Sequence, residues 1–525
     1  MKLTILSTSD IHGYIYPTDY KQRDQDLPFG LLKIDSIIKE ILAKETDPVL
    51  VIDNGDFLQG SPLTYYTAKQ TKHPARYTSI LNDIGFDAGI LGNHEFNYGK
   101  EYLADAIATL DHPILCANIL NDQGQPAFGK PYELFTFENL TVAVLGLTTQ
   151  YIPNWEQPAS IAGLSFQSAV TCAQEYIPKL QELADIVIVS YHGGFEKDLT
   201  TGEPTEALTG ENEGFELLKR IPGIDVLLTG HQHREIATVN SSVAIVQPGD
   251  KGHNIGKVSL TIEKEDGKFD ILSKKAELIS AKNTLTSSNM AEKYHGFQNE
   301  IEDWLDQKIG DIEGDMWIKD SFQVRLTGHP YIDFIHKVQM EATGTTISGT
   351  ALFTNDSKGF GPTVTMRDIV TNYIYPNTLA VVEVTGNDLK RALEKSASYF
   401  SPSANGQLEI SPAFLYPKPQ QYNYDMYAGI DYTIDVSLPT GSRIRHLSYN
   451  GKLIQEDDRL EIVINQYRAV GGGNYDMFSA DKIVREVTVD MTELIAEYFN
   501  KHSPIQPSTF ANFQVIQSQT TLLTH

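Results

Sequence analysis

Short apolar runs alternate with helical patterns over residues 1–250, and this alternation restricts the possible folds more than any other feature of the sequence. Residues 31–42 carry Leu and Ile at three- and four-residue spacing, which predicts an amphipathic helix. We predict buried strands at Leu3–Leu6, Val49–Ile52, Ala88–Leu91, Val142–Leu145, Ile186–Val189 and Val226–Leu228. Strands that alternate with helices are typical of a layered α/β domain.

The rest of the chain divides into a hairpin, a helix and a second domain. Residues 257–272 alternate apolar and polar side chains around Asp266-Gly267, which predicts a hairpin that closes the first domain. A mostly polar segment with an apolar stripe from Tyr294 to Ile309 predicts a connecting helix. The mixed pattern that follows predicts an α+β domain. We therefore place a first domain, a linker and a second domain at residues 1–275, 276–310 and 311–525.

Composition excludes several kinds of partner. The 525 residues include 42 Lys and Arg against 68 Asp and Glu, which gives a formal net charge of −26. A chain this acidic is not expected to bind duplex nucleic acid, RNA or anionic lipid, whereas a small anionic substrate held by metal ions is compatible with it. Cys116 and Cys172 are too few for a disulfide framework, and we predict that both are buried apolar residues. We expect a monomer.

Neither end of the sequence has the pattern expected of a targeting signal. No run approaches the roughly 18 apolar residues of a membrane helix, and the first residues, MKLTILSTSD, are too polar for a signal peptide. The final residues, QVIQSQTTLLTH, are polar and do not resemble an anchor. These features predict a cytoplasmic protein without a membrane partner. Export followed by removal of a signal is the alternative.

Side chains that commonly bind metals follow five of the predicted strands. Ligands bind outside the carboxyl ends of the strands in an open α/β sheet, so these side chains are expected to face one crevice. Each residue taken alone is more often a turn or capping residue, but five strand ends in succession favour a metal site. The set comprises Asp10, His12, Asp56, Asn93, His94, His192, His231 and His233.

The predicted ligands are oxygen and nitrogen atoms, a set that suits Zn, Mn, Fe or Co. Two divalent cations bring +4, and the carboxylates of Asp10 and Asp56 with a bridging hydroxide bring −3. The remaining charge of +1 attracts a phosphate ester. Two ions about 3.5–4 Å apart can hold the attacking and leaving oxygens of an in-line displacement.

The motifs D-x-H, G-D, G-N-H-E, a later histidine in SYHGG, and G-H-x-H resemble the calcineurin-like metallophosphoesterase superfamily. The resemblance implies that His94 is not a ligand but donates to the leaving oxygen or steadies the phosphate, which suits an imidazole. It also implies a bridging role for Asp56. One metal would bind Asp10, His12, Asp56 and His233, and the second would bind Asp56, Asn93, His192 and His231.

The whole chain resembles the two-domain 5′-nucleotidases, which include UDP-sugar hydrolases and 2′,3′-cyclic-nucleotide 2′-phosphodiesterase/3′-nucleotidases. This resemblance implies that the second domain stacks the nucleobase between two aromatic rings, here Tyr424 and Tyr475. Tyr422 is a close rival for Tyr424. Gly472 and Gly473 would let the backbone approach the ligand. From sequence alone, the tyrosines also fit half-buried strands and the glycines a flexible turn.

Two departures from the 5′-nucleotidase pattern bear on the substrate. Asn97 stands where that branch has an aspartate that orients the catalytic histidine, and Asn cannot supply its negative charge. The arginine expected after a glycine run is missing, so Lys358 and Asn377 are candidates for the pocket, or else solvated loop residues. The segments GNHEFNYG, YPNTL and YPKPQQYNYD resemble the cyclic-phosphodiesterase branch.

These patterns predict a dinuclear-metal hydrolase of nucleotide phosphoesters, with 2′,3′-cyclic-nucleotide 2′-phosphodiesterase/3′-nucleotidase favoured. The resemblance implies that a metal-bound hydroxide attacks phosphorus in line, assisted by His94 beside Asn97. A 5′-nucleotidase or UDP-sugar hydrolase is the alternative within this class. A non-catalytic nucleotide or metal sensor and a phosphoprotein phosphatase are alternatives of other classes. All seven ligand positions are filled, which disfavours the sensor, and a phosphatase needs no nucleoside-binding domain.

Overall fold

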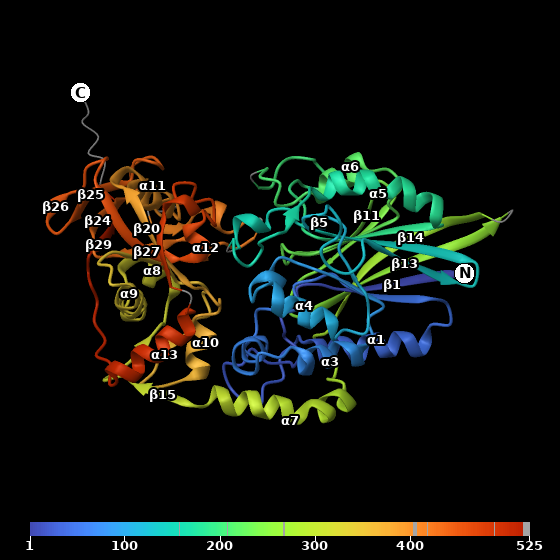
Figure 1. Cartoon of the computed structure of the whole chain (residues 1–525), viewed down its shortest axis with the longest axis horizontal. Helices are drawn as coiled ribbons and strands as arrows, with labels where there is room; N and C mark the ends of the chain where they lie inside the picture. The colour runs from blue at the N-terminus through green and yellow to red at the C-terminus, as the bar shows by residue number, and fades with distance from the viewer. Residues whose placement is uncertain are drawn as a thin grey trace. The chain divides into compact units, whose positions relative to one another are not determined.

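The chain folds into two compact units, Met1–Glu302 and Asp303–His525, in the computed structural model. The first is a layered α/β/β/α unit and the second is mixed α+β, as predicted from the sequence (Figure 1). No helix in the described part of the chain is long and apolar enough to cross a membrane. The structure describes residues 1–156, 158–206, 208–265, 268–402, 407–416, 418–487 and 489–517.

Two sheets form the centre of the first unit, and the apolar runs predicted as strands are β1, β2, β3, β7, β9 and β10. The first sheet has the order β14 (Lys268–Ser280), β13 (Asn254–Glu265), β1 (Lys2–Thr8), β2 (Val49–Asp53), β3 (Ala88–Ile90) and β4 (Ile114–Leu115). The second has the order β11 (Glu235–Asn240), β12 (Val243–Pro248), β10 (Val226–Thr229), β9 (Ile186–His192), β7 (Leu140–Thr148) and β6 (Tyr132–Phe137). Neighbouring strands from β1 to β4 and from β7 through β9 and β10 to β12 run parallel.

The two sheets pack face to face, and helices cover their outer faces. Ile5 and Ile52 of the first sheet share a buried cluster with Val144 and Ile188 of the second. Strands covered on both sides read as continuous apolar runs, which explains why the sequence revealed them. Helix α1 lies over the first sheet, and α5 and α6 lie over the second (Figure 1). The bounds are α1 (Leu31–Lys44), α2 (Pro62–Tyr65), α3 (Ala75–Ile84), α4 (Lys100–Ala108), α5 (Ala169–Leu183) and α6 (Gly214–Arg220), with a small pair of strands, β5 (Ile119–Leu120) and β8 (Ser165–Phe166).

The predicted hairpin and connecting helix are both present, and one boundary needs correction. Strands β13 and β14 pair antiparallel, while the predicted turn at Asp266-Gly267 lies outside the described residues. The connecting helix, α7 (Ser288–Leu305), ends before Ile309. Ile309 lies instead in strand β15 (Lys308–Asp311), whose extended backbone pairs with β19 (Thr363–Thr365). Both cysteines are buried, as predicted.

The second unit is built on a mixed sheet beside a smaller sheet. The larger has the order β23 (Asp425–Ala428), β17 (Ser348–Ala351), β27 (Arg459–Asn465), β20 (Leu379–Thr385) and β28 (Ile483–Val487). The smaller has the order β26 (Lys452–Leu453), β25 (Ile444–Tyr449), β24 (Asp431–Asp435) and β29 (Phe513–Ile516), and two short pairs join β16 (Met316–Trp317) to β18 (Gly359–Phe360) and β21 (Phe400–Pro402) to β22 (Leu408–Ile410). The helices are α8 (Ser321–Thr327), α9 (Pro330–Thr343), α10 (Met366–Asn372), α11 (Gly386–Ala397), α12 (Gln466–Ala469) and α13 (Met491–His502). Helices α10 and α11 each begin with a reciprocal Thr–Asp capping box, which fixes their first turns.

Acid should weaken the second unit through His336, which lies on α9 with 1% of its surface exposed. Its Nδ1 lies 2.9 Å from Ser348 Oγ, and burial lowers the pKa of the imidazole to about 3. The unfolded chain binds this proton near pH 6.5 and the folded chain does not, so stability falls as pH drops below 6.5. We expect His336→Asn to reduce the loss of unfolding free energy between pH 7 and 5 by about 2 kcal/mol.

Denaturant unfolding at the two pH values measures this effect. His446→Asn is the matched control, because His446 is exposed on β25 of the same unit. If the unfolding free energy changed equally with pH in wild type and in His336→Asn, His336 would not be a cause of the acid destabilisation.

Candidate metal centre

The predicted ligands follow the carboxyl ends of parallel strands in both sheets of the first unit. Strands β1, β2, β3, β9 and β10 each deliver at least one of them. The side chains form two neighbouring groups, and within each group the potential ligand atoms lie within 4.8 Å of one another. The groups are Asp10, His12 and His233, and Asp56, His192 and His231.

The carboxylate of Asp56 lies between the two groups. Its Oδ2 is 3.1 Å from His192 Nε2 and 3.9 Å from His12 Nε2. Asp10 Oδ1 lies 3.4 Å from His233 Nε2 and 3.9 Å from His192 Nε2. Carboxylate oxygens of both groups therefore lie within 4 Å of imidazole nitrogens. This position is compatible with the bridging role implied for Asp56, which stays a prediction.

Asn93 completes the set of seven. Its Oδ1 lies 2.8 Å from His231 Nδ1, so the amide joins the group that contains His192. All seven positions predicted from the sequence are therefore brought together. Most of these side chains are buried, whereas His233 has 32% of its side-chain surface exposed. His233 is the member of the first group that borders solvent.

The ligand loops carry an unusual backbone conformation. The positive φ values of Asp10 (54°), His12 (51°), Asp56 (59°), His231 (67°) and His233 (55°) lie in the left-handed region. Residues with a Cβ seldom adopt it, because each instance costs on the order of 1–3 kcal/mol. Backbone bonds hold these turns: Asp10 N–H donates to Gly55 O at 2.9 Å and His12 N–H to Asp56 O at 2.8 Å. Because the strain falls on five of the predicted ligands, the direction of these side chains is held at a cost in local stability.

Two glycines in the motifs allow the ligand loops to approach each other. A Cβ at Gly92 would lie 2.2 Å from Asp56 Oδ1. A Cβ at Gly230 would lie 2.1 Å from Ser9 Oγ and 2.7 Å from Asp10 Oδ2. Because real Cβ atoms do not come this close, any side chain at either position would displace a ligand carboxylate or its neighbours.

Hydrogen bonds to the outer ring nitrogens orient the histidines. His12 Nδ1 lies 2.8 Å from Gln59 O, and His192 Nδ1 lies 2.7 Å from Asn54 O. A carbonyl oxygen only accepts, so Nδ1–H donates and the Nε2 lone pair is left for a cation. His231 has the opposite arrangement, since its Nε2 lies 2.9 Å from Glu211 Oε1 and its Nδ1 faces Asn93.

The electrostatics of the cluster suit divalent cations. Burial alone would raise the pKa of Asp10, but the imidazoles of His192 and His233 lower it to about 2. Burial alone would lower the pKa of His192, but the carboxylates of Asp56 and Asp10 raise it to about 10. His192 Nε2 is buried and makes no hydrogen bond of ordinary geometry. A cation at this nitrogen would replace the proton and satisfy the atom, so the donor set fits metal binding.

His94 lies beside the cluster in the position implied for a non-ligand. Its backbone N–H donates to Asp56 Oδ1 at 2.8 Å, which ties it to the central carboxylate. Its ring packs edge-on against His12, with 5.2 Å between the centroids. His94 Nδ1 lies 2.7 Å from Asn97 Oδ1. The Asn97 side chain thus engages Nδ1 and leaves Nε2 as the nitrogen available to a substrate.

Sequence reasoning missed Glu95, which joins two ligand loops. Its Oε1 accepts the backbone N–H groups of Phe57 at 2.7 Å and Leu58 at 3.0 Å. Its Oε2 accepts those of Asp56 at 2.9 Å and Gly92 at 2.5 Å. The only sequence signal for this role is the place of Glu95 inside GNHE, beside the predicted ligand Asn93 and the predicted catalytic His94.

The two tyrosines predicted to stack the nucleobase are buried instead. Tyr424 and Tyr475 each have 0% of their surface exposed. The Tyr424 hydroxyl donates to Arg325 O at 2.9 Å, and the Arg468 guanidinium lies 3.9 Å from the centroid of the Tyr475 ring. These rings do not present a stacking surface in this structure, because core side chains and Arg468 cover them. Tyr422, the rival from the same segment, is half-buried.

The other residues predicted in the second unit have local structural roles. A Cβ at Gly472 would lie 2.5 Å from Tyr467 O, and one at Gly473 would lie 2.2 Å from Asn423 Oδ1. Gly472 thus lets the loop pack on the turn at Tyr467, and Gly473 lets it approach the segment that carries Asn423. Asn377 is half-buried, and its carbonyl accepts Met491 N–H at 2.9 Å, while the Lys358 side chain is exposed. Contact with a nucleotide stays a prediction for all four positions.

Comparison with known proteins identifies the family. The calcineurin-like phosphoesterase family matches residues 3–235, and the family of 5′-nucleotidase C-terminal domains matches residues 308–480. A Staphylococcus aureus protein solved as a candidate 5′-nucleotidase is 39% identical, with a TM-score of 0.93 over 98% of this chain and 100% of that chain. This chain belongs to the two-domain 5′-nucleotidase family.

Two further relatives agree with this assignment. The trifunctional nucleotide phosphoesterase protein YfkN of Bacillus subtilis is 29% identical, and the match takes in 99% of this chain but 39% of that longer protein. The 2′,3′-cyclic-nucleotide 2′-phosphodiesterase/3′-nucleotidase of Yersinia enterocolitica is 26% identical over 98% of this chain and 88% of that protein. The resemblance read from the motifs is confirmed, and so is the class of metal-dependent phosphoester hydrolase.

Glu95→Gln should destabilise the first unit of this family member. Each oxygen of Glu95 accepts two backbone N–H groups, so a glutamine must turn its NH₂ toward two donors in either orientation. Unsatisfied buried donors of this kind cost about 3 kcal/mol. We expect a clear loss of thermal stability, measured by calorimetry.

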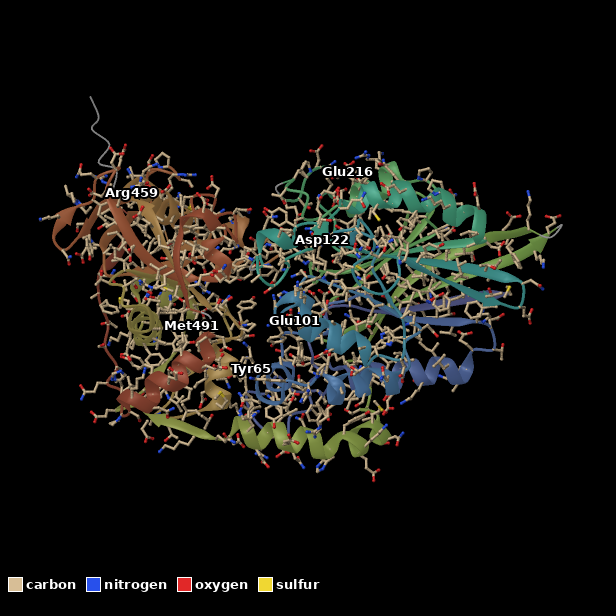
Figure 2. All side chains as sticks on the ribbon, in the orientation of Figure 1. Tyr65, Glu101, Asp122, Glu216, Arg459 and Met491 are labelled. Carbon is tan, nitrogen blue, oxygen red and sulfur yellow. The ribbon has the colours of Figure 1, made fainter. Side chains whose placement is uncertain are left out.

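Glu101→Gln is the matched control for this substitution. Glu101 lies exposed on α4 (Figure 2), close in sequence to Glu95 but outside the loop contacts. Equal melting temperatures for the two variants would contradict the role assigned to Glu95.

Proposed function

We propose that this chain hydrolyses phosphate esters of nucleotides, 2′,3′-cyclic nucleotides and 3′-nucleotides foremost. The observation that carries the proposal is the position of Asp56 between two ligand groups, with His94 bonded to the same carboxylate. A phosphoester needs positive charge on its oxygens and a proton for its leaving group. The two ligand groups and His94 offer these functions side by side.

The residues of the site divide the work. Divalent ions held by the seven ligands would supply positive charge to the phosphate and activate a water for attack. Asp56 Oδ1 holds the backbone of His94, which fixes the imidazole beside the reacting phosphate. As the P–O bond breaks, its electron pair goes to the leaving oxygen, and His94 Nε2 gives that oxygen its proton. Asn97 Oδ1 keeps the proton on Nδ1 throughout.

The choice of a cyclic substrate rests on Asn97 and on the relatives. The neutral amide at this position resembles the cyclic-phosphodiesterase branch rather than the 5′-nucleotidase branch. The leaving 2′-oxygen of a 2′,3′-cyclic ester stays tethered through the ribose. A Yersinia enterocolitica relative that bears this activity in its name is matched over 88% of its length.

A 5′-nucleotidase is the second candidate, because the Staphylococcus aureus relative, at 39% identity, was solved under that description. Both candidates use the same metal centre and the same role for His94. They differ in which ribose oxygen leaves, so turnover on matched nucleotides separates them.

Steady-state turnover of 2′,3′-cAMP, 3′-AMP, 5′-AMP and UDP-glucose by protein loaded with Mn²⁺ or Zn²⁺ tests the proposal. We expect 2′,3′-cAMP and 3′-AMP to be turned over at least about tenfold faster than 5′-AMP. We expect Asp56→Asn to lower kcat by about 10²-fold or more, since removing a bridging charge weakens both ions.

Two results would contradict parts of this proposal. If 5′-AMP were the substrate turned over fastest, the proposed metal chemistry would stand, but the proposed substrate class would be wrong. No nucleotide turnover above that of Asp56→Asn, in protein shown to contain two ions per chain, would overturn the proposed function and favour a sensor.

A further inference from the structure

Glu156 is a buried carboxyl group next to the candidate site. It has 7% of its surface exposed and follows a short 3₁₀ turn, Ile152–Asn154. Its neighbour Trp155 packs against the His231 ring, with 5.3 Å between the centroids. The segment that carries Glu156 therefore borders the ligand cluster. Neither the motifs nor the metal centre gives this carboxyl group a role.

The contact of Glu156 is with Asn97, the residue that faces His94. Asn97 Nδ2 donates to Glu156 Oε1 at 2.5 Å, across 59 positions of sequence. Asn97 Oδ1 lies 2.7 Å from His94 Nδ1. The three side chains thus form a continuous chain of hydrogen bonds that ends at the imidazole.

The direction of these bonds follows from donor and acceptor chemistry. A side-chain amide has an accepting end and a donating end, and it can be turned either way. Oε1 of Glu156 accepts a hydrogen bond whether the group is ionised or its other oxygen carries a proton. With Oε1 accepting, as in this structure, the NH₂ end of Asn97 is held toward Glu156 and the carbonyl end toward His94.

The fixed amide in turn selects one form of the histidine. Asn97 Oδ1 only accepts, so His94 Nδ1 must carry a proton. In the neutral ring Nε2 then has its lone pair, which can take up a proton from water. The resulting imidazolium can give that proton to a leaving oxygen and return to the neutral Nδ1–H form. A reversed amide would place NH₂ against Nδ1 and move the ring proton to Nε2. Such a neutral imidazole has no lone pair at Nε2 with which to take up a proton.

We propose that Glu156 is a positioning residue that acts through Asn97 to keep His94 in the Nδ1–H form needed for proton transfer. In this chain a buried carboxyl group thus stands one amide away from the histidine. The inference rests on the proposed role of His94 in phosphoester hydrolysis.

The test compares two monoesters that differ in their leaving groups. Glu156→Met keeps the side-chain length and removes the acceptor. We expect it to lower kcat for 3′-AMP about tenfold or more, since such outer contacts typically change activity 10–100-fold. We expect a change below about threefold for p-nitrophenyl phosphate, because nitrophenolate leaves without a proton. Glu156→Gln retains an acceptor and should lose less than Glu156→Met.

A second substitution separates positioning from folding. Asn97→Asp supplies an acceptor directly to His94 Nδ1, so the double variant Asn97→Asp/Glu156→Met should recover kcat for 3′-AMP to within about threefold of wild type. Equal losses on both esters, or no recovery in the double variant, would overturn the proposal. Full activity of Glu156→Met on 3′-AMP would overturn it as well.

Nitrogen NMR of the His94 ring tests the relay without reference to turnover. We expect the Nδ1–H form in wild type and a mixture of forms in Glu156→Met. An unchanged ring in Glu156→Met would count against the relay. If wild type hydrolyses no phosphoester while its ring shows this difference, the proposed function fails and the positioning role of Glu156 stands.

Discussion

The carboxylate of Asp56 is the point on which the rest of the site depends. It lies almost fully buried between two groups of imidazoles and carboxylates, and its second oxygen holds the backbone of His94. Burying several carboxylates together is unfavourable unless opposite charge is close at hand. The neighbouring imidazoles provide part of it as protons, and two divalent cations would provide it more completely. The same carboxylate thus links charge balance, metal binding and the position of the candidate general acid.

The fold supplies what this arrangement requires. Parallel strands bring their carboxyl ends to one edge, and two packed sheets place two such edges beside each other. The buried sheets are rigid enough to hold ligand turns in a strained left-handed conformation. Glu95 adds four backbone hydrogen bonds across the loops. The stability of the packed sheets therefore offsets the backbone strain of the turns that follow their strands.

Much of the first unit could be predicted from the sequence because its signals are local. Doubly covered strands read as apolar runs, and the ligands follow them within a few positions. Residues that the sequence did not reveal make contacts over long separations. Glu156, for example, lies 59 positions from its partner Asn97, and no local pattern marks such a contact. Helix α7 ended before Ile309 because pairing with β19 overrode helical periodicity. The family resemblance predicts that Tyr424 and Tyr475 stack the nucleobase. Both rings are buried by contacts in the folded unit, which no local sequence pattern marks.

The proposed mechanism requires two cations, one on either side of Asp56. Anomalous diffraction from crystals grown with Mn²⁺ measures this most directly, since it locates each ion independently of activity. We predict two peaks about 3.5–4 Å apart, one beside Asp10, His12 and His233 and the other beside Asn93, His192 and His231, with Asp56 in contact with both. A single peak, or ions bound away from Asp56, would contradict the dinuclear centre and the mechanism built on it.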